Sequence, residues 1–237
     1  MSAPNTTPTR IVLATPHARH DRLEVSLRAR PALQVTRLRS PQELSADNLQ
    51  AIAPAFVFLP HWSWLIPETV YAAFECVVFH MTDLPFGRGG SPLQNLIVRG
   101  IVETKLSALR CEKSLDAGPI YAQRALSLHG GAEEILLRAA ALMEEMIVGI
   151  VERRPTPQPQ VGEPTLFRRR RPSDGDLAEL ASLERVHDHI RMLDADGYPP
   201  AFLQMGRLRL EFGRSRLDHD NVLADVRITI VPGEEAQ

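Results

Sequence analysis

Residues 76–97 read CVVFHMTDLPFGRGGSPLQNLI, and this stretch decides the fold. A short apolar run ends in His80, a Leu-Pro bend and three glycines follow, and a Ser-Pro pair opens a further apolar segment. We therefore expect a buried strand, a glycine-rich turn and a helix, in that order. A plain structural turn would also explain the glycines, because glycine adopts positive φ angles at little cost. A histidine that ends a buried strand is likewise often only a hydrogen-bonded core residue.

Strand and helix patterns alternate on both sides of this stretch. Apolar runs typical of strands lie at residues 10–15, 33–38, 55–59, 76–80, 101–110 and 120–126. Helical patterns lie at residues 19–28, 41–52, 67–74, 92–99 and 132–152. This alternation predicts an α/β fold, a Rossmann-like and mostly parallel sheet with helices on both faces. Ligands of such sheets bind beyond the carboxyl ends of the strands.

A proline-rich segment divides the chain. Residues 155–164 contain four prolines and predict an extended connector. Beyond it we expect a helix at 177–193, a β-hairpin formed by 207–212 and 222–231, and a loose tail at 232–237. The expected organisation is an α/β catalytic domain at 1–154, a proline- and arginine-rich linker at 155–176, and a small C-terminal helix–hairpin extension at 177–237.

Composition excludes several classes of protein. The 27 basic and 29 acidic residues give no basic domain, so we expect no nucleic-acid partner. The apolar runs are too short to span a membrane, and the polar N-terminus does not resemble a signal peptide, so we expect a cytoplasmic protein. Cys76 and Cys111 are then expected as free thiols, with one disulfide as the alternative. The first strand-to-helix turn, at residues 14–19, lacks the glycines of an NAD or FAD site.

Asp116 is the second residue that could carry chemistry. It lies in the segment EKSLDAGPI, residues 112–120, between two expected strands. An aspartate in an Asx-turn is the simpler explanation. A carboxylate and an imidazole from neighbouring strand ends could instead handle protons together, and His80 ends such a strand.

The combination of these features resembles the signature of the folate-dependent formyltransferases, which include methionyl-tRNA, glycinamide ribonucleotide and sugar N-formyltransferases. That pattern reads Asn-x-His-Pro-Ser-Leu-Leu-Pro, then Arg-Gly, then Asp-x-Gly. The matching residues here are His80, Leu84, Pro85, Arg88, Gly89 and Asp116, the last of them 36 residues after the histidine. Residues 54–67 are similar to the strand and Leu-Pro turn that help hold the folate pteridine in this family, and residues 167–175 and 198–203 resemble the methionyl-tRNA and sugar branches. The resemblance covers about residues 10–214.

The resemblance implies an activity and a set of site residues. A primary amine would attack the formyl carbon of the co-substrate N10-formyltetrahydrofolate, and no metal would be needed. His80 would assist proton transfer or stabilise the oxyanion, and Asp116 would orient the histidine and accept or relay the amine proton. Folate binding is expected from Trp64, Ile66, Pro67, Leu84, Pro85, Arg88, Gly89, Leu115 and Gly118.

One position departs from the family pattern in a way that affects chemistry. The asparagine that would donate a hydrogen bond to the oxyanion falls at Val78, and valine cannot donate one. Loss of an oxyanion donor typically costs about 3–4 kcal/mol of transition-state stabilisation. His61, Ser63 and Thr82 are the candidates that could replace it. Met81 and Asp83 also differ from the usual proline and leucine.

The acceptor is expected to be a small-molecule amine, above all that of a nucleotide-linked amino sugar. The chain is shorter than a tRNA-modifying relative with a C-terminal barrel would be, and its charge is balanced. Two alternatives stay open: a hydrolase that delivers the formyl group to water, and a formyltransferase-like binding protein weakened by Val78. The 207–231 hairpin could complete the sheet edge, cap the acceptor site or form a homodimer interface.

The remaining candidates are weaker. His187 and His189 are two positions apart on an expected helix, so they face different directions and make a poor metal pair. Residues 218–220, Asp-His-Asp, fit a polar turn better than a metal site. The arginine run at 168–171 could bind phosphate but is more simply a solvated charged segment. Trp62 and Trp64 could wall a ligand pocket or pack in the core.

Overall fold

The computed structural model describes residues 7–231 of the chain. These residues form two compact units, which we treat separately. The first unit contains residues up to 89, 105–126 and 137–166, and the second contains 90–104, 127–136 and the residues from 167 onward. The two units do not change at the boundaries expected near residues 154 and 177. The three-part organisation therefore stays a prediction.

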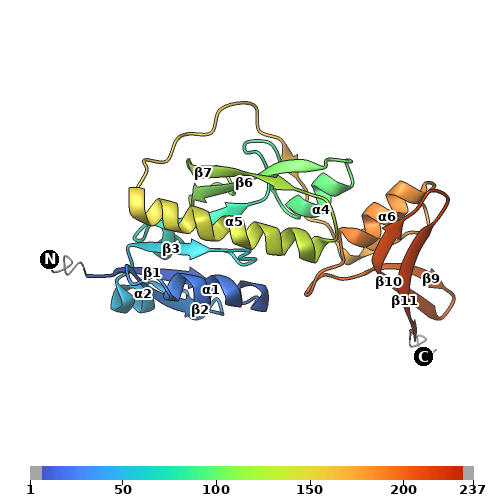
Figure 1. Cartoon of the computed structure of the whole chain (residues 1–237), viewed down its shortest axis with the longest axis horizontal. Helices are drawn as coiled ribbons and strands as arrows, with labels where there is room; N and C mark the ends of the chain where they lie inside the picture. Colours follow the sequence, from blue (N-terminus) through green and yellow to red (C-terminus); the bar gives the residue numbers. More distant parts are fainter. Residues whose placement is uncertain (1–6, 232–237) are drawn as a thin grey trace, which may run out of the picture. The chain divides into compact units, whose positions relative to one another are not determined.

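A six-stranded sheet forms the centre of the first unit (Figure 1). Its strands are β1 (Thr9–Ala14), β2 (Leu33–Leu38), β3 (Phe56–Leu59), β4 (Cys76–His80), β6 (Glu103–Arg110) and β7 (Ile120–Ser127), in the order β2-β1-β3-β4-β6-β7. Strands β2, β1, β3 and β4 are mutually parallel, whereas β6 runs antiparallel to β4. The predicted α/β class with a mostly parallel sheet is confirmed.

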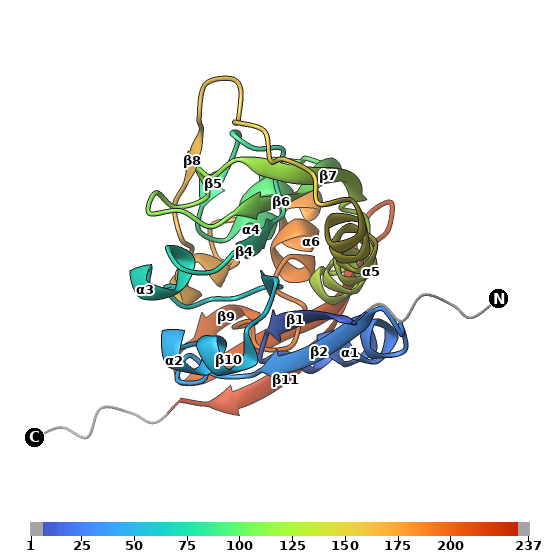
Figure 2. The same cartoon turned by 90° about the vertical axis from the view of Figure 1, so that its left-hand side faces the viewer.

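Helices cover both faces of this sheet, as predicted (Figure 2). Helices α1 (Asp21–Arg28) and α5 (Ala132–Arg153) lie on one side, where the Ser26 hydroxyl donates to the Glu144 carboxylate. Helices α2 (Ala46–Ile52) and α3 (Glu68–Tyr71) lie on the other. Side chains alternate between the two faces of a strand, so every second residue points to the same layer. The core on the α2/α3 side consists of Val12, Ala14, Leu38, Leu44, Leu49, Val57, Leu59, Val70 and Cys76.

Several helices begin later than their sequence patterns predict. Helix α2 begins at Ala46 rather than near residue 41, because the Ser45 hydroxyl accepts a hydrogen bond from the Asn48 amide at 3.3 Å and caps the first turn. Helix α6 (Leu183–Arg191) begins well after residue 177 for the same reason, since the Ser182 hydroxyl accepts from the Arg185 amide. Residues 172–175 form the short 3-10 helix η2 instead.

The second unit contains helices α4 (Pro92–Ile97) and α6 and a three-stranded antiparallel sheet of order β11-β10-β9. Strands β10 (Leu208–Leu217) and β11 (Val222–Ile230) form the predicted hairpin. The third strand, β9 (Ala201–Met205), was not predicted, because its run Ala-Phe-Leu-Gln-Met shows no alternation of polar and apolar residues. The expected tail at 232–237 lies outside the described residues.

The proline-rich segment runs extended along the first unit. Gln158 exchanges two backbone hydrogen bonds with Ile120, at 2.7 and 2.8 Å. Further on, Thr165 accepts a hydrogen bond from the Arg88 amide at 2.9 Å, beside the short pair of strands β5 (Arg88–Gly89) and β8 (Leu166–Phe167). Backbone hydrogen bonds therefore hold the connector to the first unit. They are made by its non-proline residues, since proline has no N–H to donate.

Cys76 and Cys111 are free thiols, as predicted, although the Cys111 amide donates to the Cys76 carbonyl at 2.8 Å. Burial raises the pKa of the Cys76 thiol to about 12 and that of the Cys111 thiol to about 11. Both therefore stay protonated and weakly nucleophilic near neutral pH. None of the helices between residues 7 and 231 is long and apolar enough to cross a membrane.

Candidate active site

His80 lies at the carboxyl end of β4, where its side chain is only 7 % exposed. Its Nε2 lies 2.7 Å from the carbonyl oxygen of Gly87, in the loop that follows the strand. A carbonyl can only accept, so Nε2 carries the proton and Nδ1 of the neutral ring is left with a free lone pair. Gly87 can turn its carbonyl toward the ring because it adopts a φ of 74°. The loop glycine therefore fixes both the orientation and the tautomer of His80.

Asp116 brings its carboxylate to the open nitrogen of this ring. Its Oδ2 lies 3.5 Å from His80 Nδ1 and accepts a hydrogen bond from the Gly89 amide at 2.9 Å. The residue has a φ of 52°, a left-handed conformation that aspartate tolerates better than most residues. The two residues predicted to carry the chemistry thus meet, although they are 36 positions apart. A proton placed on Nδ1 would be stabilised by the adjacent carboxylate.

Gln160 holds the Asp116 turn in place and was not predicted. Its side-chain nitrogen donates to the carbonyls of Asp116 and Gly118, both at 2.8 Å. Its side-chain oxygen accepts from Nε and Nη2 of Arg88, at 3.0 and 2.7 Å. One amide therefore links the proline-rich segment, the Asp116 turn and the glycine-rich loop. No local sequence signal separates it from Gln158, two positions earlier, because its partners lie more than 40 residues away in the chain.

Gly118 is required by close packing. A Cβ at this position would lie 2.0 Å from the carbonyl oxygen of Arg110, far inside contact distance. Glycine therefore lets the chain that follows Asp116 pass tightly over the end of β6. This gives Gly118 a structural reason that is independent of its predicted role in folate binding.

The other predicted folate-binding residues lie on three loops of the first unit. Leu84 and Pro85 are buried and joined by a cis peptide bond, while Arg88 and Gly89 are partly buried. Leu115, beside Asp116, is 68 % exposed, and Trp64 is 44 % exposed. Trp64, Ile66 and Pro67 follow β3, the strand next to β4. These segments follow β3, β4 and β6, and their binding role stays a prediction.

Val78 lies on β4 and packs against the core on the α2/α3 side, so it offers no polar group. The three candidate replacements differ in their surroundings. Ser63 is exposed, and His61 is hydrogen-bonded to His20. Thr82 is buried beside His80, with its hydroxyl 3.5 Å from the same Gly87 carbonyl and its own carbonyl accepting from Ser107 at 2.8 Å. Thr82 is thus the candidate that lies with the His80–Gly87 pair.

The weaker sequence candidates have separate structural partners. His187 contacts the Ser215 hydroxyl at 2.9 Å, and His189 contacts the Arg185 carbonyl at 2.9 Å. Burial is the main cause that lowers the pKa of both. His219 is 95 % exposed. Within residues 7–231, no three His, Cys, Asp or Glu side chains are grouped so as to hold a metal ion.

The arginine run is bound by one carboxylate of its own segment. Arg168 forms two 3.1 Å hydrogen bonds to Asp174, which also accepts from the Arg171 amide at 2.8 Å. The Arg168 hydrogen bond, followed by that of Arg171, lowers the pKa of the Asp174 carboxyl. The Arg170 guanidinium also donates to the Asp174 carbonyl at 2.8 Å, so the side chains of Arg168 and Arg170 are both engaged within this segment.

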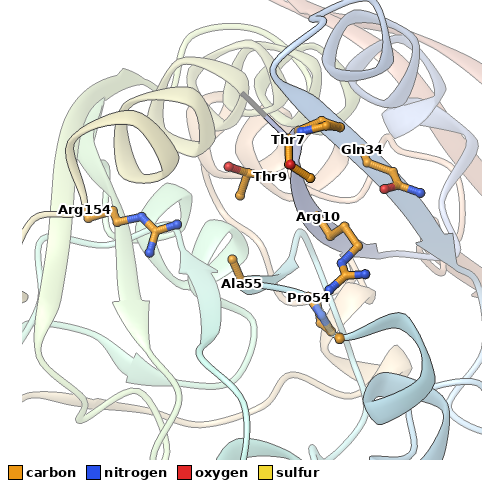
Figure 3. A pocket seen from close by; sticks show the side chains of 9 residues that line it. Thr7, Thr9, Arg10, Gln34, Pro54, Ala55 and Arg154 are labelled. Carbon is orange, nitrogen blue, oxygen red and sulfur yellow. The ribbon is translucent and has the colours of Figure 1, made fainter. Parts of the chain in front are cut away.

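A hollow of 330 Å³ lies in the first unit, near the amino ends of its parallel strands (Figure 3). It is lined by Thr9 and Arg10 at the start of β1, Gln34 of β2, Pro54 and Ala55 before β3, and Arg154 after α5, with Thr7, Pro8 and Ala53. These residues lie at the amino ends of the parallel strands, whereas His80 ends its strand. The hollow therefore contains none of the predicted site residues.

Comparisons with known proteins point to one family. Residues 172–229 match the family model described as methionyl-tRNA formyltransferase, C-terminal domain. A methionyl-tRNA formyltransferase from Wolinella succinogenes is 27 % identical over 169 residues, which cover 69 % of this chain and 54 % of that relative. The chain thus spans about half the length of this curated relative.

Solved structures extend the likeness over nearly the whole chain. A methionyl-tRNA formyltransferase from Clostridium thermocellum is 42 % identical, with a TM-score of 0.91, over 94 % of this chain and 99 % of that one. A sugar N-formyltransferase from Shewanella has a TM-score of 0.64 at 13 % identity, over 84 % of this chain and 93 % of that one, and shows the shared fold alone. The chain belongs to the formyltransferase family.

Proposed function

We propose that the protein is an N-formyltransferase that moves the formyl group of N10-formyltetrahydrofolate to a primary amine. The observation that carries the proposal is the 3.5 Å approach of the Asp116 carboxylate to Nδ1 of His80, at the carboxyl end of a parallel strand. Ligands of open α/β sheets bind at this edge. Membership of the formyltransferase family supports the reaction class.

Two exposed apolar side chains among the predicted folate-binding residues would suit a planar folate ring. Leu115 and Trp64 are large, apolar and exposed, and they lie on the loops that follow β6 and β3. Binding sites for flat organic ligands are commonly lined by such side chains together with a few polar groups. Backbone and side-chain polar groups of Arg88 and Gly89 lie on the intervening loop.

The geometry suggests how this chain's residues would assist the transfer. N10-formyltetrahydrofolate would supply the carbon that the amine attacks, and the bond from that carbon to N10 would break. His80, held by Gly87, would accept the amine proton on Nδ1. Asp116 would stabilise the resulting imidazolium from 3.5 Å, so that the proton could pass on to the leaving nitrogen. Thr82 is the side chain we assign to the oxyanion in place of the family asparagine.

The acceptor we favour is the amine of a nucleotide-linked amino sugar. Residues 172–229, which match the C-terminal family model, contain seven arginines, no lysine and eleven Asp or Glu residues. A net negative segment is poorly suited to the phosphates of a tRNA, which dominate nucleic-acid affinity. The names of the more similar relatives support methionyl-tRNA as the second candidate.

A single assay separates these acceptors. The protein would be incubated with N10-formyltetrahydrofolate and, in parallel, with methionyl-tRNA, with dTDP-, UDP- and GDP-linked amino sugars, and without acceptor. We expect one amino sugar to gain the mass of a formyl group and His80→Ala to abolish the gain. Formylation of methionyl-tRNA alone would support the second candidate, and formate release without acceptor would support a hydrolase. If no acceptor and no water is formylated, the proposal fails.

A further inference from the structure

Four polar side chains in two loops of the first unit, here called the cluster, each have one buried atom without a hydrogen-bond partner, and two of them are histidines in contact with each other. The four atoms are Oγ1 of Thr15, Nδ1 of His20, Nε2 of His61 and Nε1 of Trp62, and they are the full set of such atoms among the described residues. Buried polar groups in folded proteins are nearly always paired, since an unpaired one costs free energy. Four unpaired atoms in two loops therefore suggest that these side chains bind a ligand rather than stabilise the fold.

The two histidines are already bonded to each other through one nitrogen each. His20 Nε2 lies 3.0 Å from His61 Nδ1, so one ring donates and the other accepts. Whichever way this bond runs, the neutral rings leave one further donor and one further acceptor, at His20 Nδ1 and His61 Nε2. The Trp62 indole adds a donor, and the Thr15 hydroxyl can donate and accept. The cluster thus offers both kinds of hydrogen bond at once.

This cluster carries no charge near neutral pH. Burial, helped by the neighbouring His17, Arg19 and Arg37, lowers the pKa of His20 to about 3, and burial also lowers that of His61. The Arg37 guanidinium is engaged by the Asp21 and Glu24 carboxylates and by the carbonyls of Thr15 and His17. The cluster itself therefore offers no charged group to a phosphate or carboxylate. A hydroxyl, which donates and accepts, matches its donors and acceptors.

The four residues lie at the carboxyl ends of parallel strands, on the same side of the sheet as the carboxyl end of β4, where His80 lies. Thr15 and His20 follow β1, and His61 and Trp62 follow β3. Strand β3 lies between β1 and β4, and the three are parallel, so their carboxyl ends share one edge. A ligand whose amine reached His80 could therefore place its remaining groups over β3 and β1.

We propose that Thr15, His20, His61 and Trp62 form a neutral subsite that binds a hydroxyl of the acceptor amine. This inference rests on the proposed formyl transfer and names the chemistry of the acceptor: an uncharged ring bearing hydroxyl groups next to the amine. It predicts that hydroxyls, rather than phosphates, are read at the ends of β1 and β3.

Two nearly isosteric variants test the subsite. Thr15→Val removes a hydroxyl, and Trp62→Phe removes an indole N–H while keeping an aromatic ring. The probes are 4-amino-4,6-dideoxy-D-glucose and cyclohexylamine, which share a six-membered ring and an amine but differ in their hydroxyls. We expect wild type to favour the sugar in kcat/KM and each variant to lower that preference about 10- to 100-fold, mainly through KM for the sugar. The KM for N10-formyltetrahydrofolate should stay the same.

The Tm of the Thr15 variant distinguishes a ligand-binding role of this residue from a structural one. Replacing an unpaired buried hydroxyl by a methyl group removes a desolvation cost, so Thr15→Val should have a Tm equal to or above that of wild type. A clear fall in its Tm, or an unchanged preference in both variants, would overturn the subsite. His219→Gln, an exposed histidine in the second unit, is the matched control and should leave Tm and preference unchanged. If wild type formylates no amine, the proposed function itself has failed, which is a different result.

Discussion

Oδ2 of Asp116 lies 3.5 Å from Nδ1 of His80 while it accepts the Gly89 amide at 2.9 Å. The carboxylate is thus held by the backbone of the glycine-rich loop, and the imidazole is held by the Gly87 carbonyl of the same loop. Both groups are positioned before any ligand arrives. Preorganised groups lower the cost of reaching the transition state, because they need little reorganisation during the reaction.

Replacing His80 by glutamine should lower kcat for formyl transfer by about 10²- to 10⁴-fold, the range typical of general acid–base groups. The glutamine amide can still donate to the Gly87 carbonyl, so the loop should keep its conformation. Steady-state kinetics of formyl transfer measure the effect, with His219→Gln as a control that should retain wild-type kcat. A fully active His80→Gln enzyme would exclude proton transfer by this residue.

Asp116 can be tested by two substitutions with different expected effects. Asp116→Asn keeps an acceptor for the Gly89 amide and tolerates the left-handed φ, so its unfolding free energy should stay near that of wild type while kcat falls. Asp116→Ala leaves that amide unpaired and should lower the unfolding free energy by about 1–3 kcal/mol. Urea denaturation and kinetics on both variants separate charge from structure. Equal destabilisation of the two would show that the Gly89 hydrogen bond contributes little.

Gln160→Ala should weaken both the fold and the activity. It removes the hydrogen bonds that join the Asp116 and Gly118 carbonyls to Arg88, at a cost of about 1–3 kcal/mol in unfolding free energy. Because Asp116 is then less restrained, kcat should fall as well, and Gln160→Glu should not restore it, since a carboxylate cannot donate to the two carbonyls. The matched control is Gln158→Ala, whose side chain donates to the nearby Thr156 carbonyl. Equal behaviour of the 158 and 160 variants would contradict the assigned tether.

Gly118→Ala should destabilise the protein by about 1–3 kcal/mol or more, because the new methyl group would overlap the Arg110 carbonyl and force the backbone to move. Gly131→Ala is the comparison, since a Cβ there has no neighbour closer than 3.8 Å. Its unfolding free energy should change by no more than about 0.5 kcal/mol. Denaturant titration of both proteins measures the difference. A tolerated alanine at 118 would mean that the turn can open without cost.

Acidification should destabilise the fold through His20. Its pKa in the folded protein is about 3, below the ordinary histidine pKa of 6.5, so the unfolded chain binds more protons below about pH 6.5. The stability that comes from keeping His20 neutral is fully present above that pH and is lost as the pH falls toward 3. Denaturation at about pH 7.5 and about pH 5 should show a steeper loss for wild type than for His20→Phe. Parallel losses would show that His20 is not the group that titrates. His61, whose pKa is lowered too, leaves part of the slope in the variant.

The sequence by itself determined the strand that ends in His80, the alternation that makes an α/β sheet, and the interval from His80 to Asp116. These features correspond to short local patterns in the sequence: apolar strands, glycine turns and a motif of fixed spacing. Such patterns act over a few residues, where backbone preference and burial decide the structure. The hairpin of β10 and β11 was predictable for the same reason, whereas β9 has no alternating pattern and pairs only because β10 offers it an edge.

The tertiary structure alone decided what surrounds His80 and Asp116, the proposed catalytic pair. Gln160 reaches Asp116 from 44 positions away, and His20 meets His61 from 41 positions away. Neither partner has a local signal, because a side-chain hydrogen bond depends on where the folded backbone places both ends. The same holds for Gly118, whose need for glycine arises from the carbonyl of Arg110 on another strand. The sequence pattern predicted His80 and Asp116 as the reactive residues, and the packing of distant segments set the distance between them.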